Sequence, residues 1–292
     1  MGTAQCRHHS RRGSCRRPGV TSAGSPGPDW AADAIDPQIP SPARIYDYFL
    51  GGFANFDIDR RIAARLSAIL PDAARIARAN RALLRRVVRH MLDAGIDQFL
   101  DLGSGIPAAG SVHEMAWAVN PLARVAYVDI DPVAVTMSRR QLGADPRATA
   151  VRGDLIEIDE ILENAQIRGV LDFRRPIAAL LIGVLHRVHD DVAAERLGAR
   201  LYEVMAPGSR FAISQIGRAD DGDRGERIQA VNRIVIGKAD RLRSPAEIAA
   251  LLSRFTLVPP GVARVSAWHA EPEQPAPAPP VLDGYVAVGL RE

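Results

Sequence analysis

Three acidic residues stand at the ends of three consecutive strand-like runs. Asp101 lies in QFLDLGSG, two positions before a Gly-Ser-Gly, Asp129 closes RVAYVD, and Asp154 follows ATAVRG. Glycines in such a turn let the backbone approach a ligand closely, and open parallel sheets bind ligands at the carboxyl ends of their strands. Carboxylates at that edge would accept hydrogen bonds from ammonium or hydroxyl groups and would favour a cationic ligand.

The charge of Asp101 bears on which ligand the turn holds. The stretch GSGIPA also matches the dinucleotide fingerprint, so the glycines alone do not separate the two kinds of site. A carboxylate here would repel a pyrophosphate by about 1 kcal/mol even beyond contact distance, and Pro107 has no N–H to offer a phosphate. S-adenosylmethionine carries an ammonium, a sulfonium and a ribose but no phosphate, and it fits the turn. Asp101 could instead simply cap the turn.

The other two acids fit the remaining parts of a nucleoside. Asp129 is expected to accept hydrogen bonds from both ribose hydroxyls, and Asp154 from an adenine amino group, although each could also be a strand-end cap. Asp131 could cap the helix that Pro132 opens. The expected cofactor contacts along these three strand ends are Asp101, Leu102, Gly103, Ser104, Gly105, Asp129, Ile130, Asp154 and Leu155.

A histidine follows the fourth strand-like run. His186, in VLHRVHDD, is a candidate catalytic base that would face the transferred group. Packing or positioning is the alternative role. The pair His186 and His189 has no further ligands nearby, so we expect no metal site.

The runs that carry these residues alternate with helical segments. Strand-like runs occupy 98–102, 124–128, 148–152, 177–184 and 209–216, and helical patterns occupy 110–119, 132–142, 157–171 and 191–205. Strands alternating with helices predict βαβ units around a buried parallel sheet, and right-handed crossovers favour a doubly wound, Rossmann-like α/β architecture. A late run, GYVAVGL, is a last strand.

The segment before the sheet is helical and aromatic. Residues 38–95 have three- and four-residue apolar spacing and are expected to form an N-terminal helical cap. Within it, YDYFLGGFANFD could be a lid in which Tyr46 or Asn55 reaches the cofactor, or its aromatics could simply form the core of the cap. Residues 96–292 would then form the cofactor-binding domain.

Composition narrows the class of protein. Among 292 residues, 47% are hydrophobic and 24% are charged, and no stretch has the roughly 18 apolar residues that a membrane helix needs. We therefore expect a cytoplasmic protein with no membrane association. Residues 1–37 are basic, rich in Gly, Ser and Pro, and expected to be disordered. Because the remaining chain is close to neutral, a nucleic-acid partner is not expected.

Several motifs together resemble a known family. FLDLGSG, YVDID and RGDL are similar to the first three cofactor motifs of class I S-adenosylmethionine-dependent methyltransferases. From about Ile39 onward, PSPARIYDYFLGG, LLIGVLHRVHDD and the late VPPGV resemble the actinobacterial S-adenosyl methyltransferase family, once known only as a domain of unknown function. Pro107 departs from the general pattern, where many members have a third glycine. The resemblance implies a seven-stranded, mostly parallel sheet with a reversed last strand, and S-adenosyl-L-methionine as cofactor.

The predicted function is methyl transfer from S-adenosylmethionine to a small-molecule acceptor by direct displacement. The histidine in LLIGVLHRVHDD is similar to the base of many small-molecule O-methyltransferases, which again indicates His186. The resemblance does not imply the acceptor. Two alternatives stay open: a module that binds the cofactor without catalysis, and an NAD-dependent oxidoreductase. A homo-oligomer is possible.

Overall fold

The computed structural model describes residues 36–108, 110–217, 222–270 and 284–292. Within these residues one sheet contains eight strands: β1 (Gln98–Leu102), β2 (Arg124–Asp129), β3 (Ala148–Arg152), β4 (Ala178–Leu181), β5 (Arg210–Gln215), β6 (Thr256–Leu257), β7 (Ala263–Arg264) and β8 (Tyr285–Leu290). Their order is β3-β2-β1-β4-β5-β8-β6, with β7 also paired to β8. The first five strands are parallel, and β8 runs antiparallel to its neighbours.

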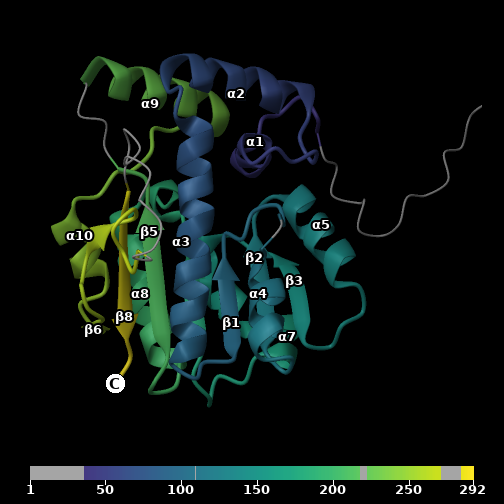
Figure 1. Ribbon diagram of the computed structural model, residues 1–292, viewed down its shortest axis with the longest axis vertical. Coiled ribbons are helices and arrows are strands. Elements are labelled where there is room, and N and C mark those ends of the chain that lie inside the picture. The colour runs from purple at the N-terminus through teal and green to yellow at the C-terminus, as the bar shows by residue number, and fades with distance from the viewer. Residues whose placement is uncertain (1–35, 109, 218–221, 271–283) are drawn as a thin grey trace, which may run out of the picture. The chain divides into compact units, whose positions relative to one another are not determined.

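One face of the sheet is covered by three helices: α3 (Ala73–Asp93), α4 (Val112–Val119) and α5 (Pro132–Leu142). In Figure 1, α3 stands in front of the strands and runs along them. Its buried residues, including Leu84, Val88 and Met91, recur at three- and four-residue spacing, which places one apolar stripe against the sheet. Because side chains alternate along a strand, Phe99 and Asp101 of β1 point to this same face.

The opposite face packs against four helices: α6 (Ile158–Glu163), α7 (Ala165–Val170), α8 (Asp191–Val204) and α10 (Pro245–Leu251). Leu100 and Leu102 of β1 contribute to this second core. Strands buried on both faces need a continuous apolar sequence, and all five residues of β1 are buried, Asp101 included. A single charged residue in such a strand therefore needs its own explanation.

A third group of helices lies at the upper end of the sheet in Figure 1 and forms the cap: α1 (Pro42–Phe49), α2 (Asp57–Ile69) and α9 (Gly222–Ile236). Apolar residues Ile45, Ile62 and Val231, one from each helix, form its small core. α9 comes from far along the sequence, whereas α3, predicted as part of the cap, packs on the sheet. From here on, "cap" means α1, α2 and α9.

The structure confirms the predicted α/β architecture and modifies some of its details. The sheet has eight strands within the described residues instead of seven, because β7 pairs with β8 for two residues. The helical pattern at 157–171 is two helices, since the Asn164 side chain caps α7 by accepting hydrogen bonds from the backbone N–H groups of Gln166 and Ile167. Residues 1–35, most of the predicted disordered tail, lie outside the described residues.

No helix in the described part of the chain has the length and apolar character needed to span a bilayer.

Candidate cofactor-binding site

Asp101 is a buried carboxylate near the carboxyl end of β1. Only 6% of the residue is exposed, and no described residue donates a hydrogen bond to its carboxylate. It lines a small cavity together with Arg81, Ser104, Gly105 and Tyr127. Burial raises the pKa of Asp101 to about 7; Arg81 opposes this rise and Asp129 adds to it. A buried carboxylate without a donor is costly, so this position favours a ligand that supplies one.

The carboxylate of Asp129, the second predicted acid, stabilises the glycine turn by a hydrogen bond to its backbone. Gly103 and Gly105 both have positive φ, at 73° and 67°, a region that favours glycine. One carboxylate oxygen of Asp129 accepts a hydrogen bond from the Gly105 N–H at 2.6 Å, and the other accepts from the Asp131 N–H at 2.9 Å. Burial raises the pKa of Asp129 to about 6. The structure thus brings Asp101, Asp129 and the glycines together.

The third predicted acid lies at the rim. Asp154 is exposed, and its side chain accepts a hydrogen bond from the Ile156 N–H, which caps a short 3₁₀ turn, η2 (Leu155–Glu157). Ile130 is exposed beside it on the next strand end, and Leu155 is half-buried. An exposed apolar side chain following Asp129 offers a surface for a flat, apolar ring.

Tyr46 and Asn55, the predicted lid residues, use their polar groups within the protein. The Tyr46 hydroxyl donates to the Ala77 carbonyl of α3 at 3.0 Å and accepts from the Asn80 amide at 3.1 Å. The Asn55 amide donates to Asp47 and to the Gly52 carbonyl. These bonds order the cap and its seat on α3, and no described contact directs either side chain toward Asp101.

The cap nevertheless covers the glycine turn. Ala54 and Phe56, in the loop between α1 and α2, pack against Ile106, directly after the turn, and against Val133 of α5. The Ser41 hydroxyl also donates a hydrogen bond to Asp131, the N-cap residue of α5. The loop predicted as a lid is therefore in contact with the turn through apolar side chains.

His186 lies on a second turn at the same edge of the sheet, η3 (Leu185–Arg187), which follows β4. Val184, at the start of this turn, packs so closely on Gly103 that a Cβ there would lie 2.8 Å from its methyl carbons. The two turns are thus neighbours. The His186 ring is buried, with 4% of the residue exposed, and its Nδ1 has no hydrogen-bond partner in the described residues. Burial and the cations around it hold the pKa of His186 well below its ordinary value.

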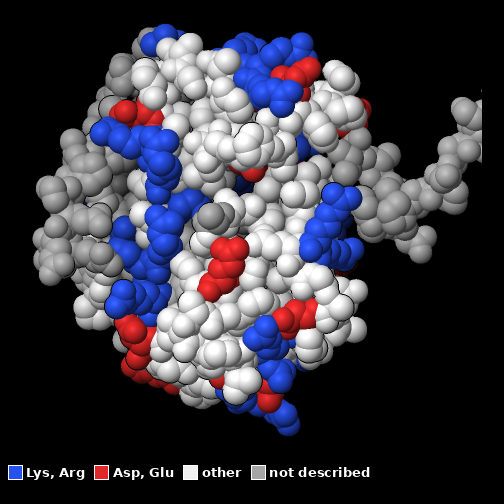
Figure 2. All heavy atoms as spheres, turned by 45° about the vertical axis from the view of Figure 1, so that its right-hand side comes forward, with Lys and Arg blue, Asp and Glu red and all other residues white. Residues whose placement is uncertain are grey.

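Arg81 of α3 is a site residue that the sequence analysis missed. Its guanidinium donates hydrogen bonds to the carbonyls of Ala108 and Gly110, beyond the glycine turn, and also lines the cavity of Asp101. Figure 2 shows basic side chains gathered in a column along α3, where Arg78, Arg85 and Arg89 are exposed. The helical pattern predicted α3 itself, but which of its arginines turns inward depends on packing against the sheet.

The arrangement can hold a small cationic molecule that also carries a carboxylate and a diol. Asp101 offers acceptors to a cation, Arg81 offers donors to an anion, and the carboxylate oxygens of Asp129 retain lone pairs for hydroxyl groups. An amino acid joined to a nucleoside has these groups, so S-adenosylmethionine fits the residues present.

Comparison with known proteins also indicates a site for S-adenosylmethionine. Residues 28–292 match the family model described as S-adenosyl methyltransferase. A candidate methyltransferase from Thermobifida fusca is 35% identical, with a TM-score of 0.81 over 91% of this chain and 100% of that chain. A DUF574 family protein from Streptomyces avermitilis is 34% identical, with a TM-score of 0.80 over 88% of this chain and 99% of that chain. No curated protein matches.

Proposed function

The chain belongs to the S-adenosyl methyltransferase family and is an S-adenosylmethionine-dependent methyltransferase, and we propose that its acceptor is a small molecule methylated with help from His186. The cofactor, when bound, supplies a methyl group activated by its sulfonium. The residues of this chain must then hold the cofactor, exclude water and align an acceptor. Alignment in a dry pocket can supply much of the rate of a direct displacement.

The observation that carries the cofactor assignment is the buried Asp101. A carboxylate that is 6% exposed and receives no hydrogen bond from the described residues is suited to the ammonium group of the cofactor's methionine part. A pyrophosphate would place like charge against it, which argues against the NAD-dependent alternative.

The other contacts follow from the same placement. We assign the cofactor carboxylate to Arg81, the ribose hydroxyls to Asp129, and the adenine to the rim formed by Ile130, Asp154 and Leu155. Gly103, Ser104 and Gly105 allow the cofactor to lie against the backbone of the turn, beside Leu102. Tyr46 and Asn55 act indirectly, by ordering the cap that packs on this turn.

His186 is the proposed proton acceptor. Its lowered pKa keeps the imidazole neutral near pH 7, and a neutral imidazole can accept a proton from an acceptor hydroxyl as the methyl group is transferred. The unpartnered Nδ1 is free for such a hydrogen bond. The burial of this residue supports a small acceptor, because a macromolecule would have to reach beneath the surface.

The test is a labelling experiment. The purified protein is incubated with methyl-labelled S-adenosylmethionine and a cell extract, which is then separated into small-molecule, protein and nucleic-acid fractions. We expect label in the small-molecule fraction, and we expect His186→Gln to lose it while still binding S-adenosylhomocysteine. Label in the nucleic-acid fraction would overturn the acceptor class. Cofactor binding without label in any fraction would favour the non-catalytic module.

A further inference from the structure

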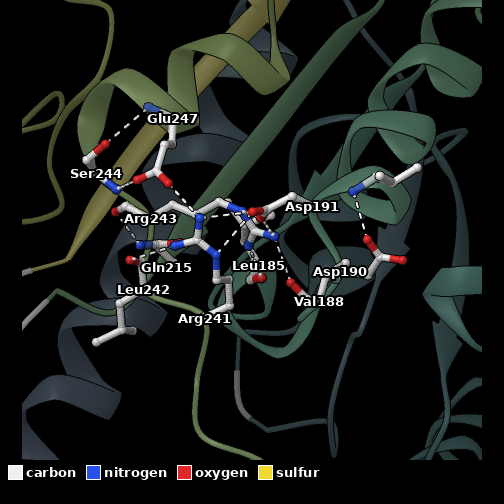
Figure 3. A network of polar contacts seen from close by, with 11 residues as sticks. Leu185, Val188, Asp190, Asp191, Gln215, Arg241, Leu242, Arg243, Ser244 and Glu247 are labelled. Atoms are coloured by element: carbon white, nitrogen blue, oxygen red, sulfur yellow. Dashed lines mark hydrogen bonds and ion pairs between the residues drawn. The ribbon is translucent and has the colours of Figure 1, made fainter.

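The turn that carries His186 has three of its carbonyl oxygens bonded by one distant segment. The Leu185 carbonyl accepts from the Arg243 guanidinium at 3.0 Å, and the Val188 carbonyl accepts from its second terminal nitrogen at 2.8 Å. Between them, the His186 carbonyl accepts from the backbone N–H of Arg241 at 2.9 Å. Figure 3 shows Arg243 between Leu185, Val188 and Asp191.

Arg243 is itself fixed from several sides. Only 3% of the residue is exposed, its guanidinium also pairs with Asp191 at 2.8 Å, and its carbonyl accepts from the Gln215 amide of β5 at 2.7 Å. Guanidinium groups present several donors in one plane, so a single side chain can hold two carbonyls and a carboxylate at fixed angles. A lysine could not reproduce this geometry.

The same segment connects the turn to the cap. Arg187, next to His186, pairs with buried Asp240 at 2.9 Å, and Asp240 accepts from the Asn232 amide of α9 at 2.6 Å. The Asp240 N–H donates to the Gln229 side chain, also on α9. The segment 240–243 therefore lies between the cap and the turn and is bonded to both.

We propose that Arg243 is a positioning residue for methyl transfer, which fixes the η3 backbone so that the His186 imidazole stays buried and directed at the acceptor. This inference rests on the proposed role of His186. Arg243 would act through the turn, because its guanidinium bonds to backbone carbonyls on both sides of His186 and to Asp191, and no hydrogen bond among the described residues joins it to the imidazole. A turn held at three carbonyls gives the ring little freedom to rotate away with its backbone.

The charged and titratable groups that face His186 lie on its own turn, on the loop that follows it and on the segment before α10. Arg187 and His189 belong to its own turn and loop, Arg243 belongs to the segment before α10, and all three disfavour a protonated ring. Asp191 and Asp240 neutralise Arg243 and Arg187, respectively. Removing Arg243 would both loosen the turn and remove a neighbouring cation, and either change makes the protonated imidazole easier to form.

The test reads His186 directly and needs no acceptor. The full chain has seven histidines, so labelling their ring Cε1 carbons gives a small set of NMR signals, of which His186→Gln identifies one. In the wild type we expect a single sharp His186 signal that reports the neutral imidazole at pH 7, with an apparent pKa below the ordinary value of histidine. In Arg243→Met we expect that signal to shift and broaden and its apparent pKa to rise. Arg243→Lys should have an intermediate effect.

Control variants separate positioning from general loss of structure. Arg254→Met removes a surface arginine that pairs with Glu203 and should leave the His186 signal unchanged. S-adenosylhomocysteine affinity should change less than twofold in Arg243→Met, and with an acceptor in hand kcat should fall at least about tenfold. An unchanged His186 signal in an Arg243→Met protein of reduced thermal stability would overturn the proposal. Methyl transfer that survives His186→Gln would instead remove the base assignment, whatever Arg243 does.

Discussion

The two turns at the ligand edge of the sheet are built in opposite ways. The turn after β1 has a buried carboxylate, Asp101, to which no described residue donates a hydrogen bond. The turn after β4 has three backbone carbonyls that all accept hydrogen bonds from residues 241–243. Because the two turns are in contact through Val184 and Gly103, their positions in the fold do not explain why their hydrogen bonding differs.

The first turn therefore leaves a buried carboxylate for a ligand to pair with, whereas the backbone of the second turn is fixed by the protein itself. Burying an ionised group without partners costs free energy, and a ligand that pairs with it recovers that cost on binding. Backbone carbonyls that are already bonded within the protein gain nothing from a ligand and contribute rigidity instead, which leaves the Nδ1 of His186 as the free acceptor of the second turn. Substitutions at the first turn should therefore change affinity for the cofactor, and substitutions at the second should change stability.

The largest effect is expected at the second turn. Arg243→Met leaves two carbonyls of this turn without their donors and removes one of the two arginine partners of Asp191, which still pairs with Arg241, so the free energy of unfolding should fall by about 3 kcal/mol. Urea denaturation measures this change. The affinity for S-adenosylhomocysteine should stay within twofold, and a parallel loss of affinity would erase the contrast between the turns.

The first turn should show the reverse pattern. Asp101→Asn removes the charge that faces the ligand ammonium, and we expect S-adenosylhomocysteine to bind roughly 30-fold more weakly, or about 2 kcal/mol, at pH 8. The amide is neutral and avoids the burial of a charge, so the unliganded variant should unfold no more easily than the wild type. Calorimetric titration and thermal unfolding report the two quantities. Asp93→Asn, at the exposed end of α3, is the matched control.

Substitution of Tyr46 tests whether the cap contacts the cofactor through a hydrogen bond or only keeps the surrounding structure in place. Tyr46→Phe deletes the hydrogen bonds to the Ala77 carbonyl and the Asn80 amide, and should lower the free energy of unfolding by about 1 kcal/mol. Cofactor affinity should be unchanged, because the hydroxyl points to α3. A tenfold loss of affinity with normal stability would assign the hydroxyl to the ligand.

The smallest effect is expected at the rim. Asp154 is exposed and already caps η2, so Asp154→Asn should weaken S-adenosylhomocysteine binding by no more than about threefold. Titration of this variant beside Asp101→Asn ranks the two acids. Equal losses would show that burial does not distinguish them.

The parallel strands of the sheet and the acidic residues at their carboxyl ends could be predicted from the sequence. Short apolar runs that alternate with helical patterns predicted the five parallel strands, and the position of Asp101 and Asp129 relative to the glycines follows from the chain itself. The capping box of α10 is a further local feature, since Ser244 and Glu247 lie three residues apart and bond each other's backbone N–H groups. Such features depend on neighbours within a few residues.

Contacts between distant segments could not be predicted in the same way. Arg81 and Arg243 look like ordinary arginines of helical or loop segments, and only the packing of α3 and of residues 240–243 places them at the two turns. The membership of α9 in the cap is a contact of the same kind, between residues more than 150 positions apart. A single sequence carries no local signal for these.

The most direct test of Asp101 as the cofactor's anionic partner is the pH dependence of S-adenosylhomocysteine binding. Burial raises the pKa of Asp101 to about 7 in the unliganded protein. The protonated carboxyl therefore contributes to the stability of the unliganded fold at low pH, and this contribution to stability is lost as the pH rises from about 4 to about 7. The ammonium group of S-adenosylhomocysteine pairs with the ionised form of Asp101, so the wild type should bind about tenfold more weakly at pH 6 than at pH 8. In Asp101→Asn the two affinities should agree within about twofold. Equal affinity and equal pH dependence in both proteins would contradict the assignment.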